Sequence, residues 1–357
     1  MQSYDLYIFD LDDTLISTFS SITKRQYRRF AEIMGLRYPG EDIIRLHWGE
    51  KLSSSLENIF GTKIGEGEAV KILEQIYLED PIKSVGGVQH ILSILRKHKK
   101  FIGVYSAGHP SLIKSNIRNS LSHDDGMFDF IFSTVENNIE KPSPYIVFAM
   151  MNKFRQTRGY DLSLNRVLVV GDSISDLLTA RNAGVDFAAV LTGPTTKDDF
   201  RKVRLEADRI FPSIMEALSP PHKHGIVSVI KNENGEYLFI RESRLGNPYY
   251  GHWSGPHGRC KKDDVIEEET VVRETYEECG VKVLPIKKLY TRDADTKVNT
   301  VSFWEVSLLE FELVLNNIGQ NESDAMAWFT ISDILNEKIP LYPGTKDFFN
   351  LLADIRG

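Results

Sequence analysis

Three aspartates and a threonine follow the first apolar run of the sequence. Residues 7–9 are apolar, and they lead into Asp10, Asp12, Asp13 and Thr14. Charged side chains at the carboxyl end of a strand are typical of ligand sites in open α/β sheets. Asp10 could attack phosphorus, Asp12 could carry the proton of the leaving group, and a metal ion could balance the crowded charge. The motif therefore indicates phosphoryl transfer, with an acidic turn after a buried strand as the alternative.

Further polar residues come shortly after later predicted strands. Ser106 is followed by two small residues, so a hydroxyl and two backbone N–H groups can face one phosphate. Lys141 lies in a loop constrained by prolines, and its ammonium group can neutralise the nucleophile and the phosphoryl oxygens together. Asp172 and Asp176, at the start of a predicted helix, offer further carboxylates to a magnesium ion. Taken singly, Ser106 could be a cap, Lys141 a surface charge and Asp172 a helix N-cap, but their order favours one shared site.

A second group of carboxylates lies on one face of a predicted helix in the last third of the chain. Glu274, Glu277 and Glu278 are spaced i, i+3 and i+4, so they repel one another unless a cation lies among them. Arg273 meets part of that need, and Mg²⁺ or Mn²⁺ would meet the rest. The alternative is a solvated acidic helix face, since glutamate favours helices.

The elements that position the first group are alternating strands and helices, which predict a parallel, doubly wound sheet. The expected strands are residues 101–105, 130–133, 166–170 and 187–191, with helices at residues 88–98, 111–121, 144–154 and 175–183. Residues 16 to about 82 space their apolar side chains by three or four, which predicts a small helical insertion after the first strand. Helices that simply cover the sheet are the alternative for that segment.

The second half of the chain has a different pattern. A proline-rich joint at residues 218–225 marks a domain boundary near residue 221. Residues 226–230 and 237–241 are predicted to pair as a hairpin around a glycine-containing turn. Residues 301–306 are expected to form a further strand, and residues 322–331 to precede the last helix.

Length and composition limit the class of protein. A chain of 357 residues, 41% hydrophobic and 26% charged, predicts a globular protein of two domains. A net charge of −7 argues against a sequence-independent nucleic-acid partner. Two cysteines, Cys260 and Cys279, form no disulfide framework, which fits a reducing compartment. The sequence shows no membrane-length apolar run and no signal-peptide pattern at its start, so we expect a cytoplasmic protein.

Residues 1–220 resemble the haloacid dehalogenase (HAD) superfamily of phosphohydrolases, in the branch with a helical cap inserted after the first motif. The residues that carry this resemblance are 10–14, Ser106, Lys141 and 171–176. The resemblance implies a Rossmann-like α/β fold and Asp10 as the nucleophile that forms an aspartyl-phosphate, with Asp12 as general acid and then base. It also implies Ser106 and Lys141 on the phosphoryl group, Mg²⁺ on Asp10, Asp172 and the carbonyl oxygen of Asp12, and Asp176 in support of that site. Because members that cleave carbon–halogen bonds lack the second aspartate, Asp12 indicates phosphate chemistry.

Residues 221–357 resemble the Nudix family, whose motif ends in Arg-Glu, two residues, Glu-Glu, one residue and Gly, as at residues 273–280. The resemblance implies an α/β/α sandwich around a mixed sheet and cleavage of nucleoside diphosphates linked to a group X. It also implies divalent metal on Glu274, Glu277 and Glu278, with Arg273 supporting them.

The upstream half of this second motif departs from the family pattern. Counting back from Arg273, the expected glutamate and glycine positions hold Val265 and Arg259, and Gly258 comes one residue too early. The loop therefore carries an insertion. The carboxylates that could replace the missing one are Asp264, Glu267, Glu268 and Glu269.

The two resemblances together predict a bifunctional, Mg²⁺-dependent hydrolase. One half would act on small phosphorylated metabolites and the other on nucleoside diphosphate-X compounds. Two alternatives remain open: a C-terminal domain that binds a nucleotide without cleaving it, and an N-terminal domain that is a phosphotransferase or mutase.

Overall fold

The computed structural model describes residues 4–48, 52–121, 125–219, 223–261, 264–294, 298–309, 323–336 and 338–356. Two compact units divide the chain, Tyr4–Ala217 and Leu218–Gly357. This division lies close to the boundary expected from the proline-rich joint.

The N-terminal unit is built on one sheet of six parallel strands. Their order across the sheet is β3-β2-β1-β4-β5-β6, so the first strand of the chain lies in the middle. The strands are β1 (Leu6–Asp10), β2 (Phe101–Ser106), β3 (Phe130–Ser133), β4 (Val167–Gly171), β5 (Asp186–Val190) and β6 (Ile210–Phe211). The predicted parallel sheet is confirmed. The sequence did not indicate β6, because two residues are too few to show a periodic pattern.

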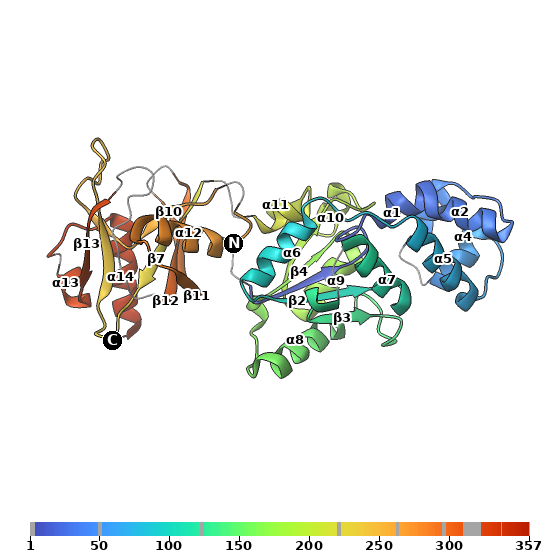
Figure 1. Cartoon of the computed structure of the whole chain (residues 1–357), viewed down its shortest axis with the longest axis horizontal. Coiled ribbons are helices and arrows are strands. Elements are labelled where there is room, and N and C mark those ends of the chain that lie inside the picture. Colours follow the sequence, from blue (N-terminus) through green and yellow to red (C-terminus); the bar gives the residue numbers. More distant parts are fainter. Residues whose placement is uncertain are drawn as a thin grey trace. The chain divides into compact units, whose positions relative to one another are not determined.

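Helices pack against this sheet through apolar side chains that alternate along its strands. Leu6 and Ile8 of β1 share one buried cluster with residues of α8 and α9, and by alternation Tyr7 and Phe9 point to the opposite face. The helices of this part are α6 (Val88–Lys97), α7 (Pro110–Leu121), α8 (Tyr145–Arg158), α9 (Ile174–Ala183), α10 (Lys197–Lys202) and α11 (Ile214–Leu218). Figure 1 shows them around the strands.

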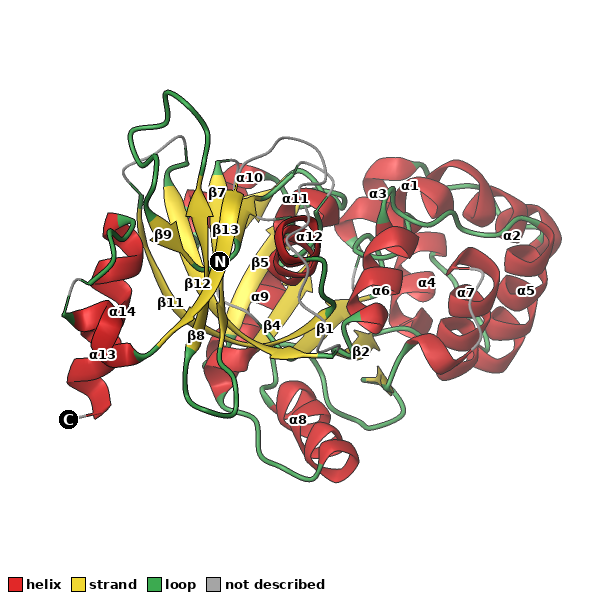
Figure 2. Cartoon of the chain, turned by 60° about the vertical axis from the view of Figure 1, so that its left-hand side comes forward, coloured by secondary structure: helices red, strands yellow, loops and turns green. Residues whose placement is uncertain are grey.

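A helical cap is inserted between β1 and α6. Its helices are α1 (Thr18–Ser21), a π-helical segment (Ile22–Gln26), α2 (Tyr27–Met34), α3 (Glu41–Leu46), α4 (Leu52–Phe60) and α5 (Glu66–Glu79). The chain enters and leaves the cap through two paired segments, because Ser17 N–H donates to Lys83 O and Val85 N–H donates to Leu15 O. Figure 2 shows that α1 to α5 form a body of helices without strands, as the spacing of apolar residues predicts.

The C-terminal unit has a four-stranded mixed sheet, β10-β7-β12-β11, and a three-stranded antiparallel sheet, β13-β8-β9. Its strands are β7 (His224–Ile230), β8 (Tyr237–Glu242), β9 (Trp253–Ser254), β10 (His257–Arg259), β11 (Val283–Asp293), β12 (Thr300–Leu308) and β13 (Ser323–Phe329). Its helices are α12 (Glu267–Cys279), α13 (Ile331–Leu335) and α14 (Pro343–Arg356).

Alternating side chains of these strands fill two separate cores. Ile226 and Ile230 of β7 pack with α12, whereas Val227 and Val229 pack with α13 and α14. Helices therefore cover both faces, and the unit is an α/β/α sandwich with a mixed sheet, as the sequence predicts.

The predicted hairpin of β7 and β8 is wrong. The turn forms, with Asn232 N–H donating to Glu236 O, but only Lys231 and Tyr237 form a bridge across it. Beyond that bridge β7 pairs with β10 and β12, while β8 pairs with β9 and β13. Two short apolar strands around a glycine turn cannot show which partner each strand takes, because tertiary pairing decides it.

Among the helices of the described ranges, none is both long and apolar enough to cross a lipid bilayer.

Candidate active sites

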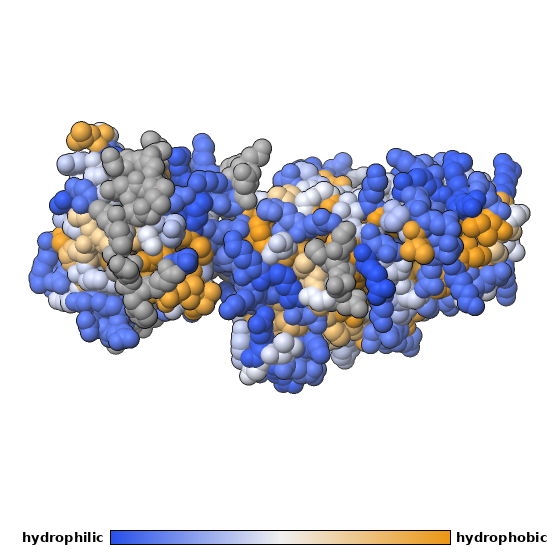
Figure 3. Space-filling view, in the orientation of Figure 1, coloured by the Kyte–Doolittle hydropathy of each residue, from blue (hydrophilic) through white to orange (hydrophobic). Residues whose placement is uncertain are grey.

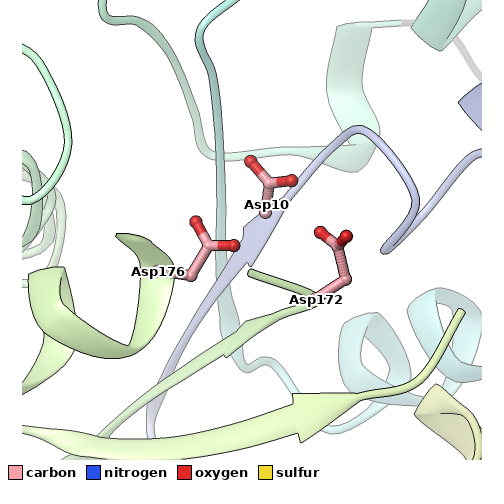
Figure 4. A group of neighbouring side chains, drawn as sticks. All are labelled: Asp10, Asp172 and Asp176. Carbon is pink, nitrogen blue, oxygen red and sulfur yellow. The ribbon is translucent and has the colours of Figure 1, made fainter. Parts of the chain in front are cut away.

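The carboxyl ends of three neighbouring strands bring the predicted catalytic residues together. Asp10 ends β1, Ser106 ends β2, and Asp172 directly follows β4. Because β1 lies between β2 and β4 in a parallel sheet, the three side chains meet at one edge. One carboxylate oxygen each from Asp10, Asp172 and Asp176 lies within 4.8 Å of the others, and all three residues are buried. Figure 4 shows these carboxylates approaching one another from β1, the end of β4 and α9.

Lys141 places its ammonium group between two of these carboxylates. Its Nζ atom lies 2.5 Å from Oδ1 of Asp10 and 2.7 Å from Oδ1 of Asp176, and its side chain is only 14% exposed. The structure thus excludes a surface charge, the alternative considered for this lysine. Burial alone would lower the pKa of Lys141, but Asp10 and Asp176 together raise it above its ordinary value, so the side chain stays charged.

The remaining negative charge of the site is not balanced by protein groups alone. Burial raises the pKa of Asp10 well above its usual range despite the opposing charge of Lys141, and Asp176 and Asp172 add to the rise. Burial and the nearby charge of Asp176 raise the pKa of Asp172 in the same way. Crowded carboxylates with raised pKa values fit a divalent cation, and carboxylate oxygens are the ligands that Mg²⁺ prefers. The donor set here therefore fits such an ion.

Tyr105 is a buried part of the site that the sequence did not single out. Its hydroxyl donates to Oδ1 of Asp176 at 2.7 Å, and its ring centroid lies 4.5 Å from Nζ of Lys141. Oδ2 of Asp176 accepts hydrogen bonds from the backbone N–H and the hydroxyl of Ser173, within the capping box of α9. Ser173, and not Asp172, is thus the N-cap of this helix. Asp176 is held from several directions and in turn orients Lys141.

Asp12 is held by hydroxyl groups from two different elements. Ser106 donates to its Oδ2 atom and Thr18 of α1 donates to its Oδ1 atom, each at 2.8 Å. The hydroxyl of Ser106 also accepts the backbone N–H of Gly108, a group expected to face phosphate. Thr18 was not identified from the sequence, because it lies at the start of the cap and not at a strand end.

Two further residues adjoin the carboxylate of Asp172: Gly193 leaves space for it, and Thr14 contacts it. A Cβ atom on Gly193 would lie 1.8 Å from Oδ2 of Asp172, so only glycine fits there. Thr14 approaches Oδ1 of Asp172 at 3.5 Å through its hydroxyl. Gly193 comes shortly after β5, so the rule that located Ser106 and Asp172 could also have located it.

Asp13 is a buried acid that supports the entry to the cap. It has a left-handed backbone with a φ of 58°, and its Oδ1 atom accepts the backbone N–H of Phe19 at 2.9 Å. Burial raises the pKa of Asp13 to about 8, while the hydrogen bond from Phe19 opposes the rise. Its carboxyl group therefore joins the first motif to the cap.

The glutamates of α12 share a helix face, but each has a protein partner. Glu274 forms an ion pair with Arg273, Glu277 lies 3.4 Å from Lys261 and 3.5 Å from Arg273, and Glu278 accepts the backbone N–H of His257 at 2.9 Å. Within the described ranges, the spacing of ligand atoms that groups Asp10, Asp172 and Asp176 does not occur among these glutamates. Their donor type fits a divalent cation, and Arg273 lies beside two of them as expected.

The inserted loop before α12 keeps two features of the upstream motif. A Cβ atom on Gly258 would lie 2.0 Å from Cδ of Glu274, so this glycine lets the strand approach the helix. Asp264 pairs with Arg273 at 2.8 Å and accepts the hydroxyl of Thr270 at 2.7 Å. Of the four candidate carboxylates, Asp264 is thus the one that contacts Arg273.

The other three candidate carboxylates are Glu267, Glu268 and Glu269. Glu267 is buried with Lys288 at 2.5 Å and Trp304 at 3.0 Å. Glu269 accepts the backbone N–H of Val265 at 2.9 Å, at the start of α12. Glu268 is also buried.

Buried carboxylates and a lysine meet at the carboxyl ends of the parallel strands, and comparison with known proteins gives the class. The chain belongs to the haloacid dehalogenase-like hydrolase family, whose model matches residues 7–190, and a model of the NUDIX domain matches residues 221–352.

Curated relatives match about half of the chain. Two bacterial proteins with the provisional name pyrophosphatase PpaX are each 26% identical to this chain. The one from Caldanaerobacter subterraneus matches over 184 residues, 51% of this chain and 80% of the relative. The one from Clostridium perfringens matches over 189 residues, 51% of this chain and 82% of the relative.

Solved structures resemble each part. A haloacid dehalogenase-like hydrolase from Bacteroides fragilis is 26% identical, with a TM-score of 0.46, and the match covers 59% of this chain and 98% of that one. The MutT protein from Methanosarcina mazei is 23% identical, with a TM-score of 0.33, and the match covers 39% of this chain and 98% of that one.

Proposed function

We propose that this protein is a bifunctional hydrolase that depends on a divalent metal ion, with Mg²⁺ as the favoured ion. Its N-terminal unit removes phosphate from small phosphomonoesters, and its C-terminal unit splits the diphosphate of nucleoside diphosphate-X compounds. The observation that carries the first activity is the contact of Lys141 with Asp10 beside the buried carboxylates of Asp172 and Asp176.

The contacts of the N-terminal residues support the following roles. An oxygen of Asp10 attacks phosphorus and the bond from phosphorus to the leaving oxygen breaks, which leaves an aspartyl-phosphate on Asp10. Asp12, protonated for this step, gives its proton to the leaving oxygen. Water then attacks the phosphorus atom, Asp12 takes the proton of that water, and phosphate leaves with Asp10 restored.

Other side chains hold the reacting groups in place. Lys141 binds the phosphoryl oxygens, and Thr18 keeps the carboxyl group of Asp12 in one orientation. Ser106 donates to Asp12 in the free site and turns its one hydroxyl proton to a phosphoryl oxygen when substrate binds. A bound Mg²⁺ would be held by Asp10, Asp172 and the carbonyl oxygen of Asp12, and would supply positive charge to the phosphoryl oxygens. The cap covers the site and selects the leaving group.

The second activity rests on the helix that carries Glu274, Glu277 and Glu278. These side chains would hold a divalent cation once Arg273 and Lys261 move away from them, and Asp264 offers Arg273 a partner outside the glutamates. One observation favours a second candidate, a domain that binds nucleotide without cleaving it: each of the three glutamates already has a protein partner.

The two activities are chemically compatible as consecutive steps. Cleavage of a nucleoside diphosphate-X compound yields phosphomonoesters, which are the substrate class of the N-terminal unit. A first unit that cannot use any product of the second would contradict this sequence of steps.

Product analysis of matched variants tests the proposal. Wild type, Asp10→Asn and Glu277→Gln are each incubated with Mg²⁺ and a panel of phosphomonoesters and nucleoside diphosphate-X compounds. Inorganic pyrophosphate joins the panel because the curated relatives carry the name pyrophosphatase. Released phosphate and nucleotide are measured separately.

Each substitution is expected to abolish a different reaction, and chelation of the metal to abolish both. Loss of phosphate release in Asp10→Asn, with no diphosphate cleaved by any variant, would favour the non-catalytic C-terminal domain. Transfer of phosphate to a sugar in preference to water would instead indicate a phosphotransferase. Full phosphatase activity in Asp10→Asn would overturn the proposed nucleophile.

A further inference from the structure

A buried carboxylate holds a surface loop of the C-terminal unit. Glu242 ends β8, and its side chain is only 1% exposed. Its Oε1 atom accepts the backbone N–H and Nε of Arg244, at 2.8 and 2.9 Å. Its Oε2 atom accepts Nη2 of Arg244, Nδ2 of Asn247 and the hydroxyl of Tyr342, at 2.5, 2.8 and 2.6 Å. One charged group thus ties the start of the loop after β8 to the residue before α14.

This loop is not held in place by the burial of its apolar tip. Leu245 is 89% exposed, and Figure 3 shows an apolar patch where the loop projects. Burial raises the pKa of a carboxyl group, but hydrogen bonds from Arg244 and Tyr342 outweigh it and lower the pKa of Glu242. The network therefore orders the loop with an ionised carboxylate and not with a core.

Tyr342, one of the three residues that the Glu242 side chain contacts, belongs to a cluster of rings. The ring centroid of Tyr249 lies 4.7 Å from that of Tyr342 and 5.8 Å from that of His252, and His257 lies 5.3 Å from Tyr342. We call Tyr249, His252, His257 and Tyr342 the ring cluster. All four residues are half-buried.

The ring cluster is separate from the hydrophobic cores of this unit. Trp253, between two members in sequence, packs in the cluster of Phe239, Phe348 and Phe349, whereas no member of the ring cluster belongs to either described core. Core packing therefore explains Trp253, and it does not explain the four other rings.

The ring cluster also adjoins the proposed diphosphate site. The backbone N–H of His257 donates to Oε2 of Glu278 at 2.9 Å, and the ring of the same residue contacts Tyr342. A ligand whose diphosphate group lies at the α12 glutamates would thus place its next group near these rings.

We propose that the ring cluster is the subsite that receives the base of a nucleoside diphosphate, and that Glu242 is the positioning residue that orders it. The inference rests on the proposed function of the C-terminal unit and deepens it. Every nucleobase has a π-face that stacks on an aromatic ring, and this contact is tolerant of base identity. The subsite therefore selects for a base but discriminates weakly between adenine, guanine and uracil.

Steady-state kinetics of the full chain test this subsite. The substrates are ADP-ribose, GDP-mannose and UDP-glucose with Mg²⁺, in an Asp10→Asn background that prevents dephosphorylation of the products. Tyr249→Ala is expected to raise KM about tenfold for all three, with kcat within about twofold of the parent, and Tyr249→Phe to keep the parental KM. Tyr250→Ala is the matched control, because Tyr250 is 54% exposed and lies outside the ring cluster.

The positioning role of Glu242 is tested in the same assay. Tyr342→Phe removes only the hydroxyl that reaches Glu242, and it is expected to raise KM severalfold at unchanged kcat. Glu242→Gln is expected to do the same if it folds, which its melting temperature reports. Parental KM values in both Tyr249→Ala and Tyr342→Phe would overturn the inference while leaving diphosphate hydrolysis intact.

Binding separates this inference from the proposed catalysis. If the parent cleaves none of the three compounds, calorimetry with each of them replaces kinetics. Binding that Tyr249→Ala weakens about tenfold would support the subsite although the proposed hydrolysis fails. Absence of binding to all three compounds, or equal binding by Tyr249→Ala, would overturn it.

Discussion

Tyr105 contacts two charged residues of the proposed phosphatase site. Its hydroxyl and Nζ of Lys141 both contact Oδ1 of Asp176, each at 2.7 Å, and Lys141 also contacts Asp10. Because the hydroxyl shares this carboxylate oxygen, it reduces the pull of Asp176 on the ammonium group. Lys141 remains available to Asp10 and to the phosphoryl oxygens.

We predict that Tyr105→Phe lowers kcat for p-nitrophenyl phosphate about tenfold. Loss of the hydroxyl draws Lys141 toward Asp176 and away from the nucleophile, while the retained ring keeps the packing. KM and the melting temperature are expected to change little, and all three quantities are measured on the same preparation. An unchanged kcat would mean that Tyr105 only fills space.

Thr18 offers a second test on a single residue, because its hydroxyl donates to Asp12, the proposed general acid. Thr18→Val is expected to lower kcat about tenfold for an alkyl phosphate and much less for p-nitrophenyl phosphate. A poor leaving group needs the proton of Asp12, whereas p-nitrophenolate leaves without it. The ratio of the two kcat values is the measurement.

Thr23→Val is the control for this substitution. Thr23 is a buried threonine of the same segment, and its hydroxyl donates to the carbonyl oxygen of Phe19 at 2.8 Å. It should lose stability without any change in the ratio. Equal effects of both substitutions would remove Thr18 from the proton-transfer step.

The candidate site residues that could be identified from the sequence are those at the ends of predicted strands. Asp10, Ser106 and Asp172 lie at strand ends, and parallel strands bring such ends together. Tyr105 and Thr18 could not be found this way, because a tyrosine inside an apolar strand and a threonine in a cap show their role only through contacts. Gly193 also follows a strand, so its position could have indicated it from the sequence.

Among the structural elements, periodicity predicted where strands and helices occur better than it predicted which strands pair with each other. Strand–helix alternation constrains a parallel sheet strongly, since each crossover is long and right-handed. The C-terminal unit lacks that constraint, and the error on β7 and β8 follows from it. Their apolar pattern fits a hairpin and two separate sheets equally well.

Glu267 joins α12 to the strands beneath it. Oε2 lies 3.4 Å from Nε2 of His224 on β7, Lys288 on β11 reaches Oε1 at 2.5 Å, and Trp304 on β12 donates to Oε2 at 3.0 Å. Burial alone would raise the pKa of Glu267, but His224 and Lys288 outweigh it and lower the pKa to about 2. The charged form therefore stabilises the folded unit.

This lowered pKa predicts acid sensitivity of the C-terminal unit. The unfolded chain takes up the proton near the ordinary pKa of 4.5 and the folded chain only near 2, so stability falls as pH decreases across that interval. The contribution lost is on the order of 3 kcal/mol. Urea unfolding followed by tryptophan fluorescence measures it, and wild type should lose more stability than Glu267→Gln between these pH values. Parallel losses would assign the acid sensitivity to other groups.

The whole molecule consists of two units, each with buried hydrophobic clusters of its own. Tyr4–Ala217 holds the parallel sheet, its covering helices and the cap, and Leu218–Gly357 holds the sandwich with its own two cores. The residues named for the N-terminal candidate site all belong to the first unit, and those named for the C-terminal site to the second. The proline-rich joint and the different pattern of strands and helices in each half led to an expected boundary near residue 221, which lies close to this division.

We predict that residues 4–217 and 218–357, produced as separate chains, each fold. The first fragment is expected to keep kcat for p-nitrophenyl phosphate within about twofold of the full chain, since all groups near Asp10 come with it. Circular dichroism and a cooperative urea transition report folding of both. A cut between residues 160 and 161 is the control, because it separates α8 from β4 and divides one core, and its fragments should show neither activity nor a cooperative transition. If residues 4–217 were inactive while the full chain is active, the C-terminal unit would be required for the phosphatase, and the two units would have to be treated as one functional body.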